Sequence, residues 1–443
     1  MFTKKTIKDI RLKGKTILLR ADYNVPLTKS GEIRNGYRIE QSIPTITYLL
    51  QQECRVIICS HLGRPNNKRD MMFSLKPVAT LLSKLLEQPV SFVDDCIGPT
   101  VDAAVAALKP GQVLLLENLR FYPQEESNDA VFASQLAGHA EVFVQDGFGV
   151  VHRAHASTDA IARYLPSVAG LLLEKEVLTI SEAMQNPKRP LMAIVGGAKI
   201  ADKLDILRTF IKMADVVAVG GAMANTFLLA EDIPIGRSKA EPHDLGLAED
   251  IIELARKEAK KRSFVFYMPQ DGVVAKEMDA RAKTRIVDWS THIVADIENY
   301  PKRPPAISSQ VAANESILDI GPFSGAFIAG SMQMVKTVIW NGVMGVTETP
   351  SLQGPIGPFA HGTELMLDSM MGQFGNKPYT LIGGGDTSAY IEQRGLVQCF
   401  DHVSTGGGAS LDLMAGRKLP GVEALQSKKK PRVLYNRTKH KRK

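Results

Sequence analysis

The chain has 443 residues, of which 44% are hydrophobic and 23% charged, and this composition predicts a globular, soluble protein long enough for two domains. No uninterrupted apolar run is long enough to span a bilayer, and the start MFTKKTIKDI lacks the apolar core of a secretory signal, so we expect no membrane association and a cytoplasmic protein. The formal net charge of +7 is concentrated in residues 427–443, which hold nine Lys and Arg and no acid, so it does not indicate a nucleic-acid-binding body.

Apolar runs of strand length recur through the first third of the chain, and most stop at glycine or at a polar residue. They are TILLRADYN, RVIICSHLGRP, VLLLENLRF and EVFVQDGFG. Between them lie segments with helical spacing, such as SLKPVATLLSKLLEQ and DAVFASQLAGHAE. The alternation predicts parallel strands that are buried on both faces.

A helical stretch, GLLLEKEVLTISEAMQN, separates these runs from a second series. The second series is LMAIVGGAK, VVAVGGAMAN, SFVFYMPQD, SILDIGP, TVIWNGVMG and YTLIGGGDT. The predicted fold class is therefore α/β, with two doubly wound, Rossmann-like parallel-sheet domains joined by a hinge helix. We expect an N-terminal domain at 1–168, the connector helix at 169–186, a second domain at 187–405 and a basic, disordered tail at 427–443.

Polar residues that follow the strands of the first half are candidates for a binding site, because ligands gather at the carboxyl ends of parallel strands. Arginines and histidines that converge from separate strands suit a small polyanion, whereas each one alone could be a surface ion pair or a structural histidine. These residues are Asp22, Asn24, His61, Arg64, Asn118, Arg120 and Asp146, with His152, Arg153 and His155 close behind.

The second half has glycine pairs and triples in the same places, with Lys199, Lys203, Asn341, Glu348 and Asp386 among them. Backbone approach, lysines and one acid suit the phosphates of a nucleotide with magnesium, although glycines after strands can also be tight turns. A related stretch, STGGGASLDL, places three glycines before a helical run, which is typical of an anion site.

Eight blocks of the sequence closely resemble the phosphoglycerate kinase family, in order and over about residues 5 to 425. They are ADYNVPL, SHLGRP, LLENLRFYPQEE, DGFGVVHRAHAST, IVGGAKIADKL, WNGVMG, IGGGDT and HVSTGGGASLDLMAGRKLPGVEAL. The resemblance implies a monomeric, hinge-bending enzyme of glycolysis and gluconeogenesis. Such an enzyme transfers the acyl phosphate of 1,3-bisphosphoglycerate to ADP, giving 3-phosphoglycerate and ATP, with Mg²⁺. It also implies that about 406–425 returns to complete the N-terminal domain.

The resemblance also implies roles for particular residues. The substrate's carboxylate and 3-phosphate would contact Asp22, Asn24, Arg38, His61, Arg64, Arg120 and Arg153, with Arg38 also serving the transferring phosphoryl group. The nucleotide would contact Lys199, Lys203, Asn341, Glu348, Gly384, Gly385, Asp386 and Thr387, with Asp386 as the metal ligand. The catalytic set would be Arg38, Lys199, Gly406, Gly407 and Gly408.

These roles agree with the physics of phosphoryl transfer, which needs in-line alignment and positive charge around the moving group. No general base is required, because the attacking oxygen is already anionic. Because an acyl phosphate hydrolyses readily, water has to be excluded, and two ligands on two domains predict domain closure.

The sequence departs from the usual family pattern at Gln145, Ala201, Ala222, Val343 and Thr347, and residues 349–358 form a longer, surface-loop-like segment. Ala222 and Thr347 fall near the expected nucleotide pocket. A nucleotide-binding scaffold with little or no turnover is therefore the alternative function. For the basic tail, contact with RNA, lipid or another acidic partner is the alternative to a solvated extension.

Overall fold

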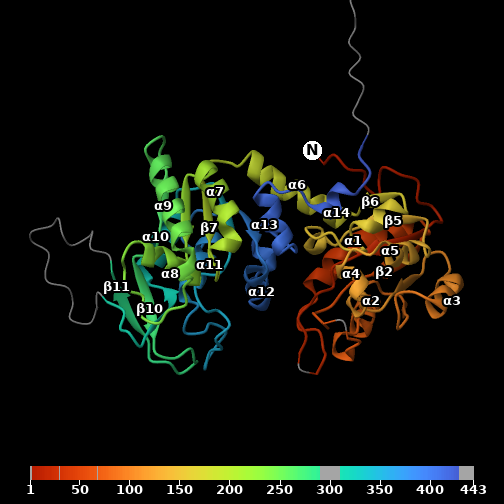
Figure 1. Ribbon diagram of the computed structural model, residues 1–443, viewed down its shortest axis with the longest axis horizontal. Coiled ribbons are helices and arrows are strands. Elements are labelled where there is room, and N and C mark those ends of the chain that lie inside the picture. Colours follow the sequence, from red (N-terminus) through yellow and green to blue (C-terminus); the bar gives the residue numbers. More distant parts are fainter. Residues whose placement is uncertain (1, 29, 67, 290–309, 429–443) are drawn as a thin grey trace, which may run out of the picture.

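The computed structural model describes residues 2–28, 30–66, 68–289 and 310–428. Figure 1 shows two lobes side by side, with α6 (Leu171–Gln185) between them. We call the part built on strands β1 to β6 the first lobe and the part built on β7 to β15 the second lobe. Residues 429–443 of the predicted basic tail lie outside the described ranges.

The first lobe is built on a six-stranded, all-parallel sheet with the order β3-β4-β2-β1-β5-β6. Successive residues of β1 face opposite sides, because Ile17 and Leu19 belong to one buried apolar cluster and Leu18 to another. Both faces are therefore covered, as the continuous apolar runs predict. The strands are β1 (Thr16–Arg20), β2 (Arg55–Cys59), β3 (Val90–Phe92), β4 (Val113–Leu115), β5 (Val142–Gln145) and β6 (Ser167–Ala169). The α-helices are α1 (Tyr37–Gln51), α2 (Lys76–Leu85), α3 (Pro99–Ala107), α4 (Pro123–Glu126) and α5 (Ala130–Ala137).

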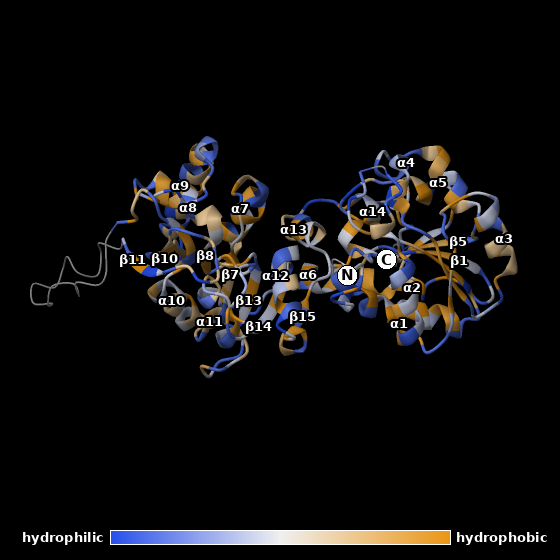
Figure 2. Ribbon diagram, turned by 90° about the horizontal axis from the view of Figure 1, so that it is seen from below, coloured by the Kyte–Doolittle hydropathy of each residue, from blue (hydrophilic) through white to orange (hydrophobic). Residues whose placement is uncertain are grey.

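The second lobe contains another six-stranded parallel sheet, with the order β15-β14-β13-β7-β8-β9. Its strands are β7 (Leu191–Val195), β8 (Val216–Val219), β9 (Val265–Tyr267), β13 (Thr337–Asn341), β14 (Tyr379–Gly383) and β15 (His402–Val403). Its helices are α7 (Leu204–Met213), α8 (Gly221–Ala230), α9 (Leu245–Ala259), α10 (Pro322–Met332), α11 (His361–Met370) and α12 (Gly385–Gln393). Figure 2 shows the apolar strands inside both lobes, with polar residues on the outer surfaces of the helices. The predicted fold class, α/β with two parallel sheets, is confirmed.

One predicted strand belongs elsewhere. The run SILDIGP forms β12 (Ser316–Ile320), which pairs antiparallel with β10 (Asp271–Ala275) in a separate three-stranded sheet. The third strand is β11 (Arg285–Asp288), and the order is β11-β10-β12. The inclusion of SILDIGP in the parallel sheet was wrong, because a short apolar run carries no information on strand direction. This small sheet forms one wall of a cavity described below.

The C-terminal segment crosses from the second lobe to the first. It contains α13 (Gly408–Met414) and α14 (Pro420–Glu423), and Lys4 bridges Ser427 in antiparallel fashion beside the N-terminus. One apolar cluster joins the lobes and runs from Phe148 through Leu173 of α6 to Leu207 of α7. Within the described ranges, no helix combines the length and apolar character that crossing a membrane requires.

Candidate active site

A cavity of about 180 Å³ opens at the carboxyl ends of the first lobe's strands. All seven residues predicted to bind the phosphoglycerate line it together, as do the three glycines of the C-terminal segment. The lining is Asp22, Asn24, Arg38, His61, Arg64, Arg120, Arg153, Gly406, Gly407 and Gly408, with Gly149, Val150 and His152. The cavity is therefore rich in cationic side chains, and its size suits a short polyanion.

Local structure explains why these side chains converge. Asp22 and His61 stand just beyond the ends of β1 and β2, so the parallel register of the two strands brings them together. Arg38 projects from the first turn of α1, where its Nη1 lies 2.8 Å from Oδ2 of Asp22. Arg120 donates to the carbonyl of Gly63 at 2.7 Å, which ties two loops of the rim together.

Burial and neighbouring arginines keep His61, which lines this cavity, and His155, which does not, in the neutral form. Burial lowers the pKa of His61 well below its ordinary value, and the charges of Arg20 and Arg120 lower it further. The pKa of His155 is lowered to about 4, again first by burial and then by nearby arginines. The positive field therefore comes from guanidinium groups, which stay charged throughout the physiological pH range.

A residue missed by the sequence analysis lies beneath the cavity. Arg20, the last residue of β1, is 1% exposed, and its Nε donates to Ser157 Oγ at 2.8 Å. Its Nη2 lies 3.8 Å from Oε1 of Glu125 and 3.4 Å from Nδ1 of His61. Arg20 thus supports His61 from below. An arginine at the end of an apolar strand was the only signal for it.

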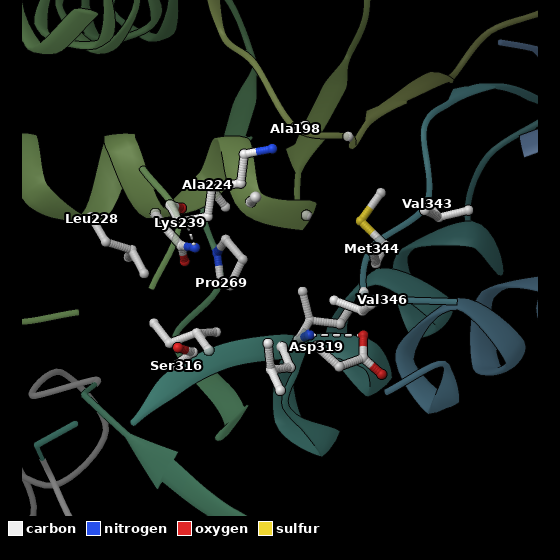
Figure 3. A pocket seen from close by; sticks show the side chains of 18 of the residues that line it. Ala198, Ala224, Leu228, Lys239, Pro269, Ser316, Asp319, Val343, Met344 and Val346 are labelled. Carbon is white, nitrogen blue, oxygen red and sulfur yellow. Dashed lines mark hydrogen bonds between the residues drawn. The ribbon is translucent and has the colours of Figure 1, made fainter. Parts of the chain in front are cut away.

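A second cavity, of about 390 Å³, lies in the second lobe between α8 and the small antiparallel sheet. In Figure 3, Ala224 and Leu228 of α8 stand on one side of the hollow, Met344 and Val346 on another, and Ser316 and Asp319 of β12 below. Its walls are mostly apolar, and Gly197, Gly221 and Gly345 are among the lining residues. The polar groups include Asn225, Arg237, Lys239, Glu348 and Asp386, and the first three were not predicted. Arg237 and Lys239 lie in a loop after α8, where only their charge could have indicated them.

Lys203 is the most constrained of the predicted nucleotide-binding cations. Its Nζ donates to the side chain of Asn341, and an ideal Cβ on Gly197 would lie 3.1 Å from its Cε. Burial lowers the pKa of Lys203 to about 8, and the carboxylate of Asp386 partly opposes this shift. Thr387 accepts a hydrogen bond from the N–H of Gly342 at 2.7 Å. These residues therefore form one connected group at the ends of β13 and β14.

Other predicted residues are less constrained. Lys199 has a side chain that is 56% exposed, and its Nζ lies 4.0 Å from Oε1 of Glu241. It lines neither of the two cavities. Glu348 is exposed and lines the second cavity, as does Ala222, whereas Thr347 does not. Residues 352–355 of the longer loop are exposed, as expected for a surface segment.

The two glycine runs meet between the lobes. An ideal Cβ on Gly407 would lie 3.8 Å from the backbone N of Gly385, so the segment before α13 adjoins the start of α12. On its other side, an ideal Cβ on Gly408 would lie 3.1 Å from Nε2 of His152 in the first lobe. The glycines of 406–408 therefore have one lobe's cavity on one side and the other lobe's phosphate-loop candidate on the other.

The donor set near Gly385 fits a magnesium ion that arrives with a phosphate group. Asp386 is exposed at the N-terminal turn of α12. Among the described residues, no three His, Cys, Asp or Glu side chains gather as a metal cage. Magnesium bound to a nucleotide needs only one or two protein carboxylates, because phosphate oxygens and water complete its octahedron. A single carboxylate such as that of Asp386 would meet this need.

Comparisons with known proteins agree with this geometry. A family model described as phosphoglycerate kinase matches residues 7–417. A phosphoglycerate kinase of Moorella thermoacetica is 44% identical over 425 residues, which cover 96% of this chain and all of that protein. One of Chloroflexus aurantiacus is 43% identical, with 96% and 99% coverage. The structure of phosphoglycerate kinase from Coxiella burnetii, 35% identical, covers 95% of this chain and 98% of that one with a TM-score of 0.75.

Proposed function

This chain belongs to the phosphoglycerate kinase family, and from that premise we propose how its two cavities divide the reaction. The enzyme is a phosphotransferase with a carboxyl group as acceptor, and it acts in glycolysis and gluconeogenesis. It transfers the acyl phosphate of 1,3-bisphosphoglycerate to ADP and, in reverse, the γ-phosphate of ATP to 3-phosphoglycerate. The first cavity takes the phosphoglycerate and the second takes the nucleotide.

The observation that carries this proposal is the composition of the first cavity. Four guanidinium groups, those of Arg38, Arg64, Arg120 and Arg153, converge there from separate segments of the chain. Such forks bind carboxylate and phosphate in two-point geometry, which suits a three-carbon acid with a phosphate at its far end. Asn24 and Asp22 supply acceptors for a hydroxyl group. The neutral His61 adds a hydrogen bond without adding charge.

In the second cavity, the mostly apolar walls receive the base, and Glu348 accepts from the ribose hydroxyls. The group that holds the phosphates does not line this cavity: it is Lys203, Asn341 and Thr387, with the backbone of Gly384 and Gly385. We propose that Asp386 binds Mg²⁺, which neutralises charge on the phosphates when it is bound.

Transfer takes place between the cavities. We propose that the glycine run Gly406–Gly408 offers its free backbone N–H groups to the moving phosphoryl group, and that Arg38 and Lys199 approach its equatorial oxygens. The N–H of Gly406 itself donates to Ser404 Oγ at 3.0 Å. Because Lys199 is exposed and lines neither cavity, we propose that it reaches the site when the lobes close about α6. Closure also excludes water, which protects the acyl phosphate from hydrolysis.

We propose that the domains run from 1 to 168, completed by about 406–425, and from 187 to 405, with 169–186 as the connector. We further propose that the enzyme works as a monomer in the cytoplasm. Its thiols support a reducing compartment, because Cys54, Cys59, Cys96 and Cys399 are all free and the first three are buried.

A coupled assay of ADP formation from magnesium-ATP and 3-phosphoglycerate tests the proposal. Turnover should require both substrates and should fall by about two to four orders of magnitude in Arg38→Ala and Lys199→Ala. A folded protein that binds either ligand without turnover would favour the scaffold alternative instead.

A further inference from the structure

One hydrogen bond joins the lobes beside the transfer site. The hydroxyl of Tyr37 donates to the carbonyl oxygen of Val403 at 2.9 Å, across 366 positions in the sequence. Tyr37 is the first residue of α1 in the first lobe, and Val403 is the last residue of β15 in the second. Figure 2 shows β15 at the inner edge of the second lobe, next to α6.

The half-buried ring of Tyr37 also contacts the second lobe. It packs against the apolar cluster that contains Ile391 and Val403, whereas Ile39, two residues later, is part of the first lobe's core. Burial raises the pKa of Tyr37, and the neighbouring carboxylates of Glu176, Glu392 and Glu40 raise it further, so its hydroxyl stays a donor at physiological pH. Side chains only two residues apart thus contact the apolar clusters of different lobes: Tyr37 that of the second lobe and Ile39 that of the first.

Both ends of this bond adjoin groups of the transfer site. Arg38 directly follows Tyr37, and Gly406 comes three residues after Val403; both line the first cavity. Arg38 is also held by Asp22, because its Nη1 lies 2.8 Å from Oδ2 of Asp22. We propose that Tyr37 is a positioning residue for phosphoryl transfer, whose hydroxyl sets the distance between Arg38 and Gly406–Gly408. This inference rests on the proposed function of these groups.

Tyr37→Phe tests it, because phenylalanine keeps the ring in the apolar cluster and removes only the donor. Small displacements of groups that contact the moving phosphoryl cost rate more than binding. We expect kcat to fall about tenfold, with the KM of each substrate changed by less than about twofold. If Tyr37→Phe does not fold, Tyr37→Gln replaces it, because glutamine keeps an N–H donor. In Tyr37→Gln we expect kcat to fall by less than about tenfold and each KM to change by less than about twofold.

A matched control is Tyr122→Phe, which removes a tyrosine hydroxyl that donates to Asp95 Oδ1 at 2.6 Å within the first lobe. Its kcat should equal that of the unmodified protein. A double-mutant cycle then separates positioning from general structure. In an Arg38→Ala background, Tyr37→Phe should lower kcat by less than about twofold, because the group it positions is gone.

Three results would overturn the inference in an active protein: an unchanged kcat in Tyr37→Phe, an equal loss in the control, or an equal loss with and without Arg38. Inactivity of the unmodified protein would overturn the proposed function itself. The two failures are therefore distinguishable from the first measurement.

Discussion

Arg20 and Glu125 form an ion pair in the interior of the first lobe, with both side chains 1% exposed and Nη2 3.8 Å from Oε1. Both carboxylate oxygens of Glu125 also accept hydrogen bonds from Ser157. The backbone N–H of Ser157 donates to Oε2 at 3.0 Å, and its hydroxyl donates to Oε1 at 2.6 Å. The pair lies directly under His61 and His155. Burying two charges in this way stabilises a fold only while both partners remain.

Replacing one member of this pair should be costly. In Glu125→Gln the guanidinium of Arg20 stays buried without its counter-charge, and we expect a loss of about 3 kcal/mol in the free energy of unfolding by urea. Glu231→Gln, which breaks the surface pair with Arg256, is the control and should cost less than about 1 kcal/mol. Equal losses in the two variants would contradict the account.

Nucleotide binding should take up protons near pH 8. The pKa of Lys203 is lowered to about 8 by burial in the described structure, and added phosphate charge favours its protonated form, so binding raises the pKa. ADP affinity should therefore be greatest below pH 8 and fall as the pH rises through this value.

Calorimetry at pH 8 in two buffers of different ionisation enthalpy measures this uptake directly. Lys203→Arg is the control, because arginine stays charged and the uptake should disappear. No net proton uptake in the unmodified protein would exclude Lys203 as the group that titrates.

Trp289 should report on the nucleotide. Its Nε1 donates to Pro269 O at 2.8 Å, its ring lies over Gly272, and it lines the second cavity. The chain's other tryptophan, Trp340, is completely buried. ADP should change the tryptophan fluorescence, and Trp289→Phe should lose this change and raise the KM for ADP roughly threefold to tenfold. Inorganic pyrophosphate, which has no base, is the control ligand. A full response in Trp289→Phe would show that the base binds elsewhere.

Gly406 should not tolerate a methyl group. An ideal Cβ there would lie 2.2 Å from the ring of Phe148, which is completely buried. Gly406→Ala should therefore displace the glycine run and lower kcat about 100-fold, with a stability loss of about 1–3 kcal/mol. In Gly246→Ala the new Cβ meets nothing within 4 Å, and activity should be retained. Steady-state rates and thermal unfolding measure both effects, and full activity in Gly406→Ala would refute the assigned contact.

The strand pattern was enough to predict both parallel sheets. Strands buried on both faces need unbroken apolar runs, and polar residues follow where they end, so Asp22 and His61 could be placed at the same edge from the sequence. The direction of β12 could not be predicted, because β12 and its partner β10 are both short, and only their pairing distinguishes parallel from antiparallel.

Contacts that depend on three dimensions were not predictable from pattern. Arg20 belongs to an apolar strand and reads as a solvent-facing end, yet the loops after β4 and β5 cover it. The bond from Tyr37 to Val403 joins positions 366 residues apart, and no local period encodes it. Lys199 was predicted by resemblance to a motif. Its exposed side chain shows that a motif match identifies a residue without identifying the contacts that it makes in the fold.

The return of the C-terminal segment has a consequence for biosynthesis. The Lys4 ammonium donates to the carbonyl of Glu423, the N–H of Lys5 donates to the carbonyl of Gln426, and the N–H of Gln426 donates to the carbonyl of Ser167, the first residue of β6. During synthesis, the strands of the first lobe's sheet are made early. Residues 423–426, which pack beside β6, are made only after the whole second lobe. Until then, the hydrogen bonds that residues 423–426 make with Lys4, Lys5 and Ser167 cannot form. A chain truncated before Pro420 would keep the strands of both sheets but lose these hydrogen bonds between its N-terminal and C-terminal segments.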